Sequence, residues 1–146
     1  MQAIPKIWFG LLLAMETAAA PVDEAKALFN SHVQRAHAFD PVWADLYADD
    51  AVIRHKRLYP TGEVRVVTLP TVQYKVLIRQ AMPLAKSRGD TSEYSQVGHQ
   101  AEAAGFRIPA SRFCHLTHYT RPLSLFVAPD RSGQWLIFEE LSESRP

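Results

Sequence analysis

Two histidines carry the side chains best suited to acid–base chemistry in this sequence. A neutral imidazole can serve as a general base because its pKa lies near neutral pH. His55 lies in a run expected to be a β-strand, and His32 lies on or beside the apolar stripe of an expected helix. A cavity between these elements would let the pair drive a dehydration, a cyclisation or a proton shift. The alternative is that His55 belongs to a solvated strand face with Arg54, Lys56 and Arg57.

A second group of reactive side chains lies in Phe113–Tyr119, where Cys114 is followed by His115 and His118. Residues three apart on a strand point to opposite faces, so the two histidines do not converge on a metal. His99 could join one of them from a neighbouring strand. Cys114 would need a base on its own face, and His118 lies about 13 Å away along a strand that rises roughly 3.3 Å per residue. We therefore expect Cys114 in the core and no metal site.

Size and charge limit the classes of protein that fit this chain. It has 146 residues, of which 21% are charged, and a formal net charge of +1. This length supports one domain with one core. The basic residues are scattered without a basic block, which argues against a nucleic-acid partner. With a single cysteine no intramolecular disulfide is possible. The usual phosphate-loop, serine-hydrolase and zinc-protease motifs are absent from the sequence, and no cofactor is expected.

Residues 1–19 have the pattern of a secretory signal peptide. Lys6 supplies the positive start, Ile7–Met15 forms a short apolar run, and small residues at 17–20 suit cleavage. The apolar run is too short to span a bilayer. We expect cleavage after Ala19, a periplasmic or secreted protein, and no attachment to a membrane after cleavage. The alternatives are a buried N-terminal helix or a retained anchor.

The remaining residues, 20–146, are expected to form a single domain with three helices. Asp23 and Asp40 are good N-caps for the first two. Pro83 is expected to kink the third helix or to end it near Met82. The three helices are expected at residues 24–38, at 41–47, and from 70 or 71 to 88.

Alternating and turn-bounded segments predict the strands. The turn at 60–63 joins a first hairpin, and Pro129–Gly133 is a typical hairpin loop. Pro109 and Pro122 predict a bulge or a break where they occur. The strands are expected at residues 51–59, 64–69, 94–103, 106–119, 123–128 and 134–141. This order indicates an α+β fold, with helices packed on one face of a curved sheet.

Two segments, Trp43–Ile53 and Gly133–Glu140, carry a family resemblance. The first is similar to the helix–Asp-Asp-Ala–strand junction, and the second to the last strand, of the nuclear transport factor 2-like superfamily. Ketosteroid isomerases and SnoaL polyketide cyclases share this cone-shaped, cystatin-like fold. The resemblance extends over residues 22–142 and implies three N-terminal helices packed on a curved, mostly antiparallel sheet. The superfamily holds enzymes, binding proteins and assembly domains, so the resemblance indicates a fold rather than an activity.

The resemblance also implies positions for catalytic residues. When the family junction is laid on Ala48–Ala51, His55 falls where ketosteroid isomerases have their catalytic Asp. The tyrosine that stabilises the oxyanion falls near Ser31 or His32. The second oxyanion donor, a protonated Asp in those enzymes, falls near residues 124–125, where this chain has no carboxylic acid. All three roles are changed, so steroid isomerisation is not expected.

We expect this fold to leave a mostly apolar cavity between helices and sheet, which is the default ligand site. The aromatic residues expected in the core or around the cavity are Trp43, Tyr47, Tyr74, Tyr94, Phe113 and Tyr119. Glu102, Glu139 and Glu140 are expected to be surface charges on strands. The first hypothesis is a protein that binds a small apolar or aromatic molecule. The alternatives are a SnoaL-like isomerase, dehydratase or cyclase with His55 as base, and an assembly module that forms a homodimer through its sheet face.

Overall fold

A computed structural model describes residues 19–145, which form two α-helices, one 3-10 helix and seven strands. The helical segments are α1 (Pro21–His37), η1 (Pro41–Leu46) and α2 (Thr71–Arg88). The strands are β1 (Tyr47–Leu58), β2 (Val64–Leu69), β3 (Ser92–Ser95), β4 (Gln100–Glu102), β5 (Gly105–Cys114), β6 (Tyr119–Pro129) and β7 (Trp135–Ser144). Residues 1–18 of the predicted signal peptide lie outside the described range.

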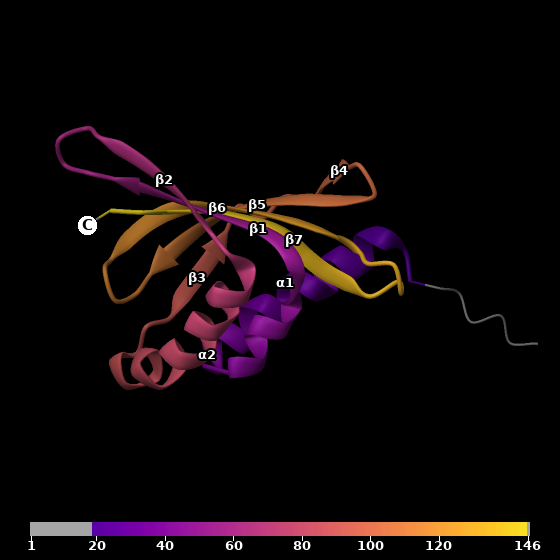
Figure 1. Cartoon of the computed structure of the whole chain (residues 1–146), viewed down its shortest axis with the longest axis horizontal. Helices are drawn as coiled ribbons and strands as arrows, with labels where there is room; N and C mark the ends of the chain where they lie inside the picture. Colours follow the sequence, from indigo (N-terminus) through magenta and orange to yellow (C-terminus); the bar gives the residue numbers. More distant parts are fainter. Residues whose placement is uncertain (1–18, 146) are drawn as a thin grey trace, which may run out of the picture.

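The strands form one sheet in the order β2-β1-β7-β6-β5-β3, and β4 also pairs with β5. β1 and β7 are parallel, whereas all other neighbours are antiparallel. Figure 1 shows the sheet curved over α1 and α2, which lie on the same side of it. The predicted α+β class and curved sheet are confirmed. Three helical segments occur where predicted, the third after the first hairpin, but the second is a 3-10 helix rather than an α-helix.

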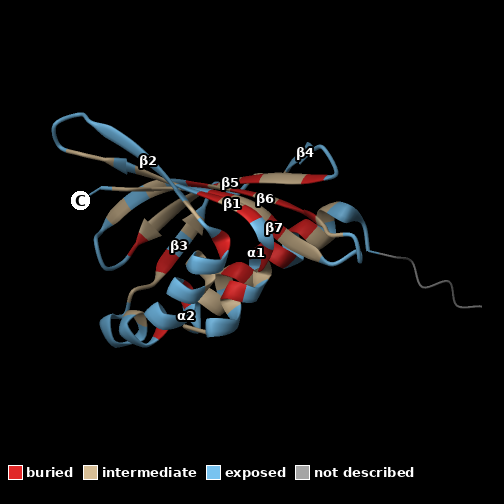
Figure 2. Ribbon diagram, in the orientation of Figure 1, coloured by how far each residue is buried: buried red, intermediate tan, exposed pale blue. Residues whose placement is uncertain are grey.

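The core fills the space between the helices and the concave face of the sheet (Figure 2). The side chains that the sheet buries most completely are Ile53, Ile108, Leu125, Val127 and Ile137. Burying one such side chain contributes about 1.5–3 kcal/mol. Among residues 19–145, no helix combines the length and apolarity that crossing a membrane requires.

The junction from helix to strand has the predicted N-cap, but the helix ends and the strand begins earlier than predicted. Asp40 caps η1, because its Oδ1 accepts a hydrogen bond from the Val42 N–H at 2.9 Å. The helix ends at Leu46, and β1 begins at Tyr47 rather than at Ala51. The consequence is that Tyr47 belongs to the sheet, with its side chain 1% exposed.

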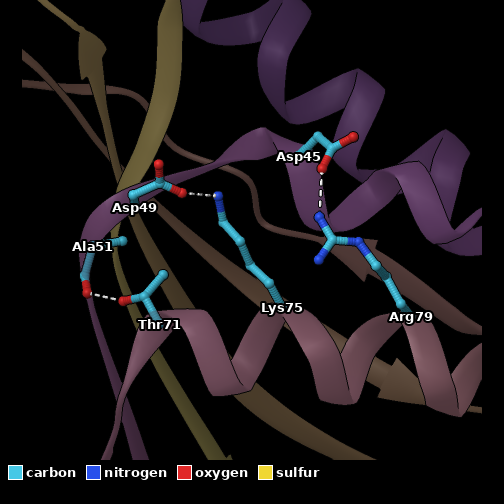
Figure 3. Close-up of polar contacts among 6 residues, drawn as sticks. All are labelled: Asp45, Asp49, Ala51, Thr71, Lys75 and Arg79. Carbon is cyan, nitrogen blue, oxygen red and sulfur yellow. Dashed lines mark hydrogen bonds and ion pairs between the residues drawn. The ribbon is translucent and has the colours of Figure 1, made fainter.

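Helix α2 holds this junction in place (Figure 3). The Thr71 hydroxyl donates to the buried carbonyl of Ala51. Lys75 pairs with Asp49 at 2.8 Å, and Arg79 pairs with Asp45 at 2.7 Å. These contacts fix the start of β1 against α2.

Prolines interrupt the elements less than the sequence predicts. α2 continues through Pro83 to Arg88, so the predicted end near Met82 is wrong. β5 and β6 also continue through Pro109 and Pro122. Pro109 lies between the stretches of β5 that pair with β3 and with β4, and Pro122 lies just beyond the last pair of β6 with β7. The missing N–H groups therefore fall at gaps in the hydrogen-bond ladders.

Other boundaries shift for local reasons. α1 begins at Pro21, before the predicted cap at Asp23, because proline suits the first position of a helix. The strand predicted at 94–103 is divided into β3 and β4, with Gln96 between them at a φ of 52°. The strand predicted at 106–119 ends at Cys114, and a turn leads into β6.

Candidate functional site

A carboxylate lies inside the molecule, on the last strand. A register shift in the pairing of β6 with β7 leaves Phe138 as a bulge. The bulge brings Glu140 to the same face as Ile137, whereas strict alternation places residues three apart on opposite faces. Glu140 pairs with Ile53 and Leu125, both in the core, and its exposed fraction is only 5%. The prediction that Glu140 is a surface charge is wrong.

Two tyrosine hydroxyls hold this carboxylate. Tyr47 donates to Oε2 of Glu140. The hydroxyl of Tyr74, on α2, lies 3.0 Å from Oε1 and 3.2 Å from Oε2. The two tyrosine rings meet edge to face, with 5.4 Å between their centroids. The last strand, the first strand and α2 thus meet at one buried acid.

Burial raises the pKa of Glu140 above its ordinary value, while the tyrosine hydrogen bonds and the charge of Arg112 act in the opposite direction. Burial, followed by the charge of Glu140, raises the pKa of Tyr47 and Tyr74 well above the ordinary value. Both phenols therefore keep their protons near neutral pH. The cluster can hold a proton in a place shielded from water.

His32 packs on this cluster from α1. Its exposed fraction is 2%, and its Nε2 lies 3.5 Å from the hydroxyl oxygen of Tyr47. Its ring contacts Trp43 edge to face, with 5.2 Å between the centroids. Burial, followed by the charge of Arg112, lowers the pKa of His32 to about 3. The ring is therefore neutral at physiological pH and is a weak base.

Two buried nitrogens beside this cluster have no hydrogen-bond partner within residues 19–145. They are Nδ1 of His32 and Nε1 of Trp43. Buried polar atoms are nearly always paired, and leaving one unpaired costs about 1–3 kcal/mol. The two rings are in contact, so both unpaired atoms belong to one aromatic cluster.

A pocket of about 120 Å³ borders Trp43, whereas His32 lies outside its lining and contacts the Trp43 ring. Its wall includes Phe39 and Trp43, Met82 and Ala85 of α2, Tyr94 of β3 and Arg112 of β5. We call this space the interior pocket. A dry cavity of about 150 Å³ can hold benzene, so the interior pocket suits a single ring that extends toward its mouth. Larger hollows, of about 450 and 630 Å³, lie at the β1–β2 and β6–β7 turns, and an open one of about 570 Å³ lies between α1 and β3.

Two arginines lie side by side near the interior pocket. Arg112 is half-buried, lines the pocket, and donates from Nε to the Ser92 hydroxyl at 2.9 Å. Its cross-strand partner is Arg121, also half-buried. Burial and the neighbouring Arg112 lower the pKa of Arg121. In the described part of the chain, neither guanidinium takes part in an ion pair.

His55, the predicted base, lies on the concave face but in a different environment from His32. Its Nδ1 lies 2.8 Å from the Ser142 hydroxyl, and its Nε2 lies 2.6 Å from the Ser144 hydroxyl. Burial, followed by the charges of Arg121 and other arginines, lowers its pKa. The ring is half-buried rather than solvated. No hydrogen bond or ring contact joins His55 to His32 within residues 19–145.

The structure brings together some of the predicted pocket residues. Trp43 lines the interior pocket, and Tyr47 and Tyr74 hold Glu140 behind it. Phe113 alternates with Arg112 and so faces the other side of the sheet, where its ring contacts that of His115 at 5.2 Å. Tyr119 lies farther along the concave face, with the Arg145 guanidinium 4.5 Å from its ring centroid.

The cysteine and the histidines near it stay apart. Cys114 is buried, as predicted, and its Sγ lies 3.6 Å from Oδ1 of Asp90. His115 and His118 are exposed in the turn between β5 and β6. No group of three potential metal ligands comes together in residues 19–145.

Sequence reasoning missed Glu140, Arg112 and Arg121. For the arginines a signal was present, because Arg112 shares its alternation with Ile108 and Ala110, which face the core. A charge in phase with the apolar face of a strand indicates an inward-facing charge. For Glu140 the sequence has no such signal, because the bulge at Phe138 reverses its phase.

Comparisons with known proteins were made by sequence and by structure. No family model matches the sequence, and no curated protein matches it significantly. Solved structures do resemble it. An NTF2-like protein of unknown function from Shewanella oneidensis MR-1 is 11% identical with a TM-score of 0.62, over 86% of this chain and 100% of that chain.

Two further structures show the range of similar proteins. An NTF2-like protein with a cystatin-like fold from Novosphingobium aromaticivorans is 13% identical with a TM-score of 0.56, over 84% of this chain and 80% of that chain. The yeast UBP3-associated protein BRE5 is 15% identical with a TM-score of 0.62, over 86% of this chain and 96% of that chain. The TM-scores show a shared fold. At identities this low, the likeness carries no information about activity. With its curved sheet over α1 and α2, the chain has the nuclear transport factor 2-like fold.

Proposed function

We propose that the protein binds a small aromatic molecule in the interior pocket. The observation that carries this proposal is Nε1 of Trp43, a pocket residue, which is buried without a partner in the described residues. A ligand with one acceptor on its ring would pair the Trp43 N–H, which can only donate. Neutral His32 offers either a donor or an acceptor, depending on its tautomer.

The surroundings of these nitrogens support an aromatic ligand. Phe39, Trp43 and Tyr94 present ring faces and edges, and Met82 adds an adaptable apolar surface. Small-molecule sites are usually apolar with a few fixed polar groups that set orientation. The pocket combines these apolar groups with a polar side formed by His37, Asp90, Thr91, Ser92 and Arg112. Its volume of about 120 Å³ favours one ring over two.

Titration with benzamide tests this proposal. We expect saturable binding by calorimetry, with a dissociation constant between micromolar and millimolar for a ligand this small. Ala85→Phe would place a ring in the pocket from α2, and we expect it to weaken binding at least tenfold. Ala27→Phe, on the exposed side of α1, is the matched control and should bind as the wild type does. If Ala85→Phe bound benzamide with the same affinity as the wild type, the proposal would be contradicted.

A second candidate is proton-transfer catalysis, as in a SnoaL-like isomerase, dehydratase or cyclase. It is favoured by a buried carboxylate with a raised pKa that two phenols hold near the pocket. In this candidate Glu140 replaces His55 as the base, because serine hydroxyls occupy both ring nitrogens of His55. Deuterium exchange at the methyl group of acetophenone should then be faster with the wild type than with Glu140→Gln. Equal rates would remove this candidate.

Two expectations from the sequence stay proposals. One is export to the periplasm or medium with cleavage after Ala19, which the intact mass of the exported protein would test. The other is a homodimer through the outer sheet face, where Leu141 is 47% exposed. A monomer by light scattering at tens of micromolar would count against the dimer.

A further inference from the structure

Basic side chains line up across the concave face of the sheet. Arg112 on β5 pairs with Arg121 on β6. The register that pairs Leu123 with Ser142, continued by two residues, brings Arg121 level with Ser144. Ser144 in turn pairs with Arg57 on β1. Three arginines and one serine thus form a row across four neighbouring strands. A protein with a formal net charge of +1 concentrates positive charge here.

Within this row, Arg112 and Arg121 repel each other, although neighbouring groups, Tyr94 and Glu140 among them, outweigh burial and raise the pKa of Arg112. Like charges directly opposite on antiparallel strands repel each other, and half-burial removes the water that would screen them. Two carboxylates are in electrostatic range, since Glu140 acts on Arg112 and Asp90 acts on Arg121. Neither forms an ion pair with them in the described residues, and Glu140 already accepts from two tyrosines.

Arg112 lines the interior pocket, and Arg121 lies directly across from it on β6. Arg112 uses Nε for Ser92, and its two Nη atoms make no hydrogen bond within residues 19–145. Arg121 Nε is buried without a partner in the same range. The charges of both arginines act on Tyr94, which lines the interior pocket together with Arg112. Arg112 therefore borders the aromatic lining itself, and its cross-strand neighbour Arg121 adds a second guanidinium beside it.

We propose that the guanidinium groups of Arg112 and Arg121 together bind the carboxylate of a small aromatic acid whose ring occupies the interior pocket. This inference rests on the proposed function and names its ligand class. Guanidinium groups donate paired N–H groups in a geometry that matches a carboxylate. The bound acid would also neutralise the repulsion between the two arginines. A phosphate has the same oxyanion chemistry and must be separated by experiment.

Calorimetry with benzoate and benzamide, which differ in charge but little in shape, tests the inference on the full chain. We expect the wild type to bind benzoate at least tenfold more tightly than benzamide. Arg121→Gln should lose this preference while its affinity for benzamide stays within twofold of the wild type. That unchanged affinity also shows that the variant is folded. Arg131→Gln, in the exposed loop before β7, is the matched control and should keep the full preference.

The outcomes separate the two proposals. If benzamide fails to bind, the proposed function and this inference both fall. If benzamide binds and benzoate binds no better, or if Arg121→Gln keeps the preference, only the inference is overturned. Inorganic phosphate should compete with benzoate weakly, because it places no ring in the pocket. Phosphate that binds as tightly as benzoate would overturn the aromatic acid in favour of a phosphate ligand.

Discussion

Replacing Glu140 with alanine is expected to lower the free energy of unfolding by about 3–5 kcal/mol. The change would leave the buried hydroxyls of Tyr47 and Tyr74 without their acceptor, and each unsatisfied group costs about 1–3 kcal/mol. It would also open a void between β7 and α2, where Glu140 is now 5% exposed. Urea denaturation of the two proteins measures the difference directly.

The neighbouring residue supplies the control. Glu139 faces the outside of the sheet, where it pairs with Arg107 at 2.5 Å and its side chain is 40% exposed. An exposed ion pair contributes about 0–1 kcal/mol, so Glu139→Ala should change stability little. If the two alanine variants lost the same stability, Glu140 would not hold the buried cluster that we describe.

Comparing the wild type with Glu140→Gln tests the burial of Glu140 through the pH dependence of the free energy of unfolding. Burial raises the pKa of Glu140 in the folded protein above its ordinary value of 4.5. The folded state then binds more protons than the unfolded state, so stability falls as pH rises. This contribution is fully present below 4.5 and is lost as pH rises through the higher pKa of the folded state. The wild type should therefore lose stability relative to Glu140→Gln between pH 4 and neutrality.

Gly105→Ala is expected to be the second strongly destabilising change, at about 3 kcal/mol. A Cβ at this position would lie 1.9 Å from the carbonyl oxygen of Val127 and 2.8 Å from Cβ of Ala128. Backbone cannot yield as a flexible side chain does, so β5 and β6 would have to separate. Val127 is also where the register of β6 on β7 shifts, which sets the direction of Glu140. Thermal denaturation measures the loss.

Gly98→Ala is the comparison for this prediction. Its added Cβ would meet only the ring of Pro109, at 3.1 Å from Cγ, and a small side-chain shift relieves that contact. We expect a cost below about 1 kcal/mol. Equal losses in the two glycine variants would show that strand separation is not the cause.

Local signals in the sequence predicted most of the fold. The Asp40 cap, the hairpin that joins β1 to β2, and the loop before β7 follow from residue types that act over a few positions. Element ends were less predictable. Tyr47 enters the sheet because its side chain packs in the core, and Pro83 stays inside α2 because neighbouring packing outweighs its local preference.

The candidate site was less accessible to sequence reasoning. The alternation of β5 and β6 contained the inward direction of Arg112 and Arg121, but we made no prediction for either residue. The direction of Glu140 depends on the bulge at Phe138, a property of the β6–β7 pairing that one strand cannot reveal. The serine partners of His55 were also out of reach, because they come from the distant strand β7.

The indole N–H resonance of Trp43 tests the central claim most directly, because this N–H is the buried donor without a partner in the described residues. In nitrogen-15 spectra, assigned with Trp43→Phe, it should move as benzamide or benzoate is added and should saturate with the calorimetric affinity. The indole signal of Trp135, far along the chain on β7, should stay in place. A Trp43 signal that does not move when ligand binds would place the ligand elsewhere and contradict the interior pocket as the binding site.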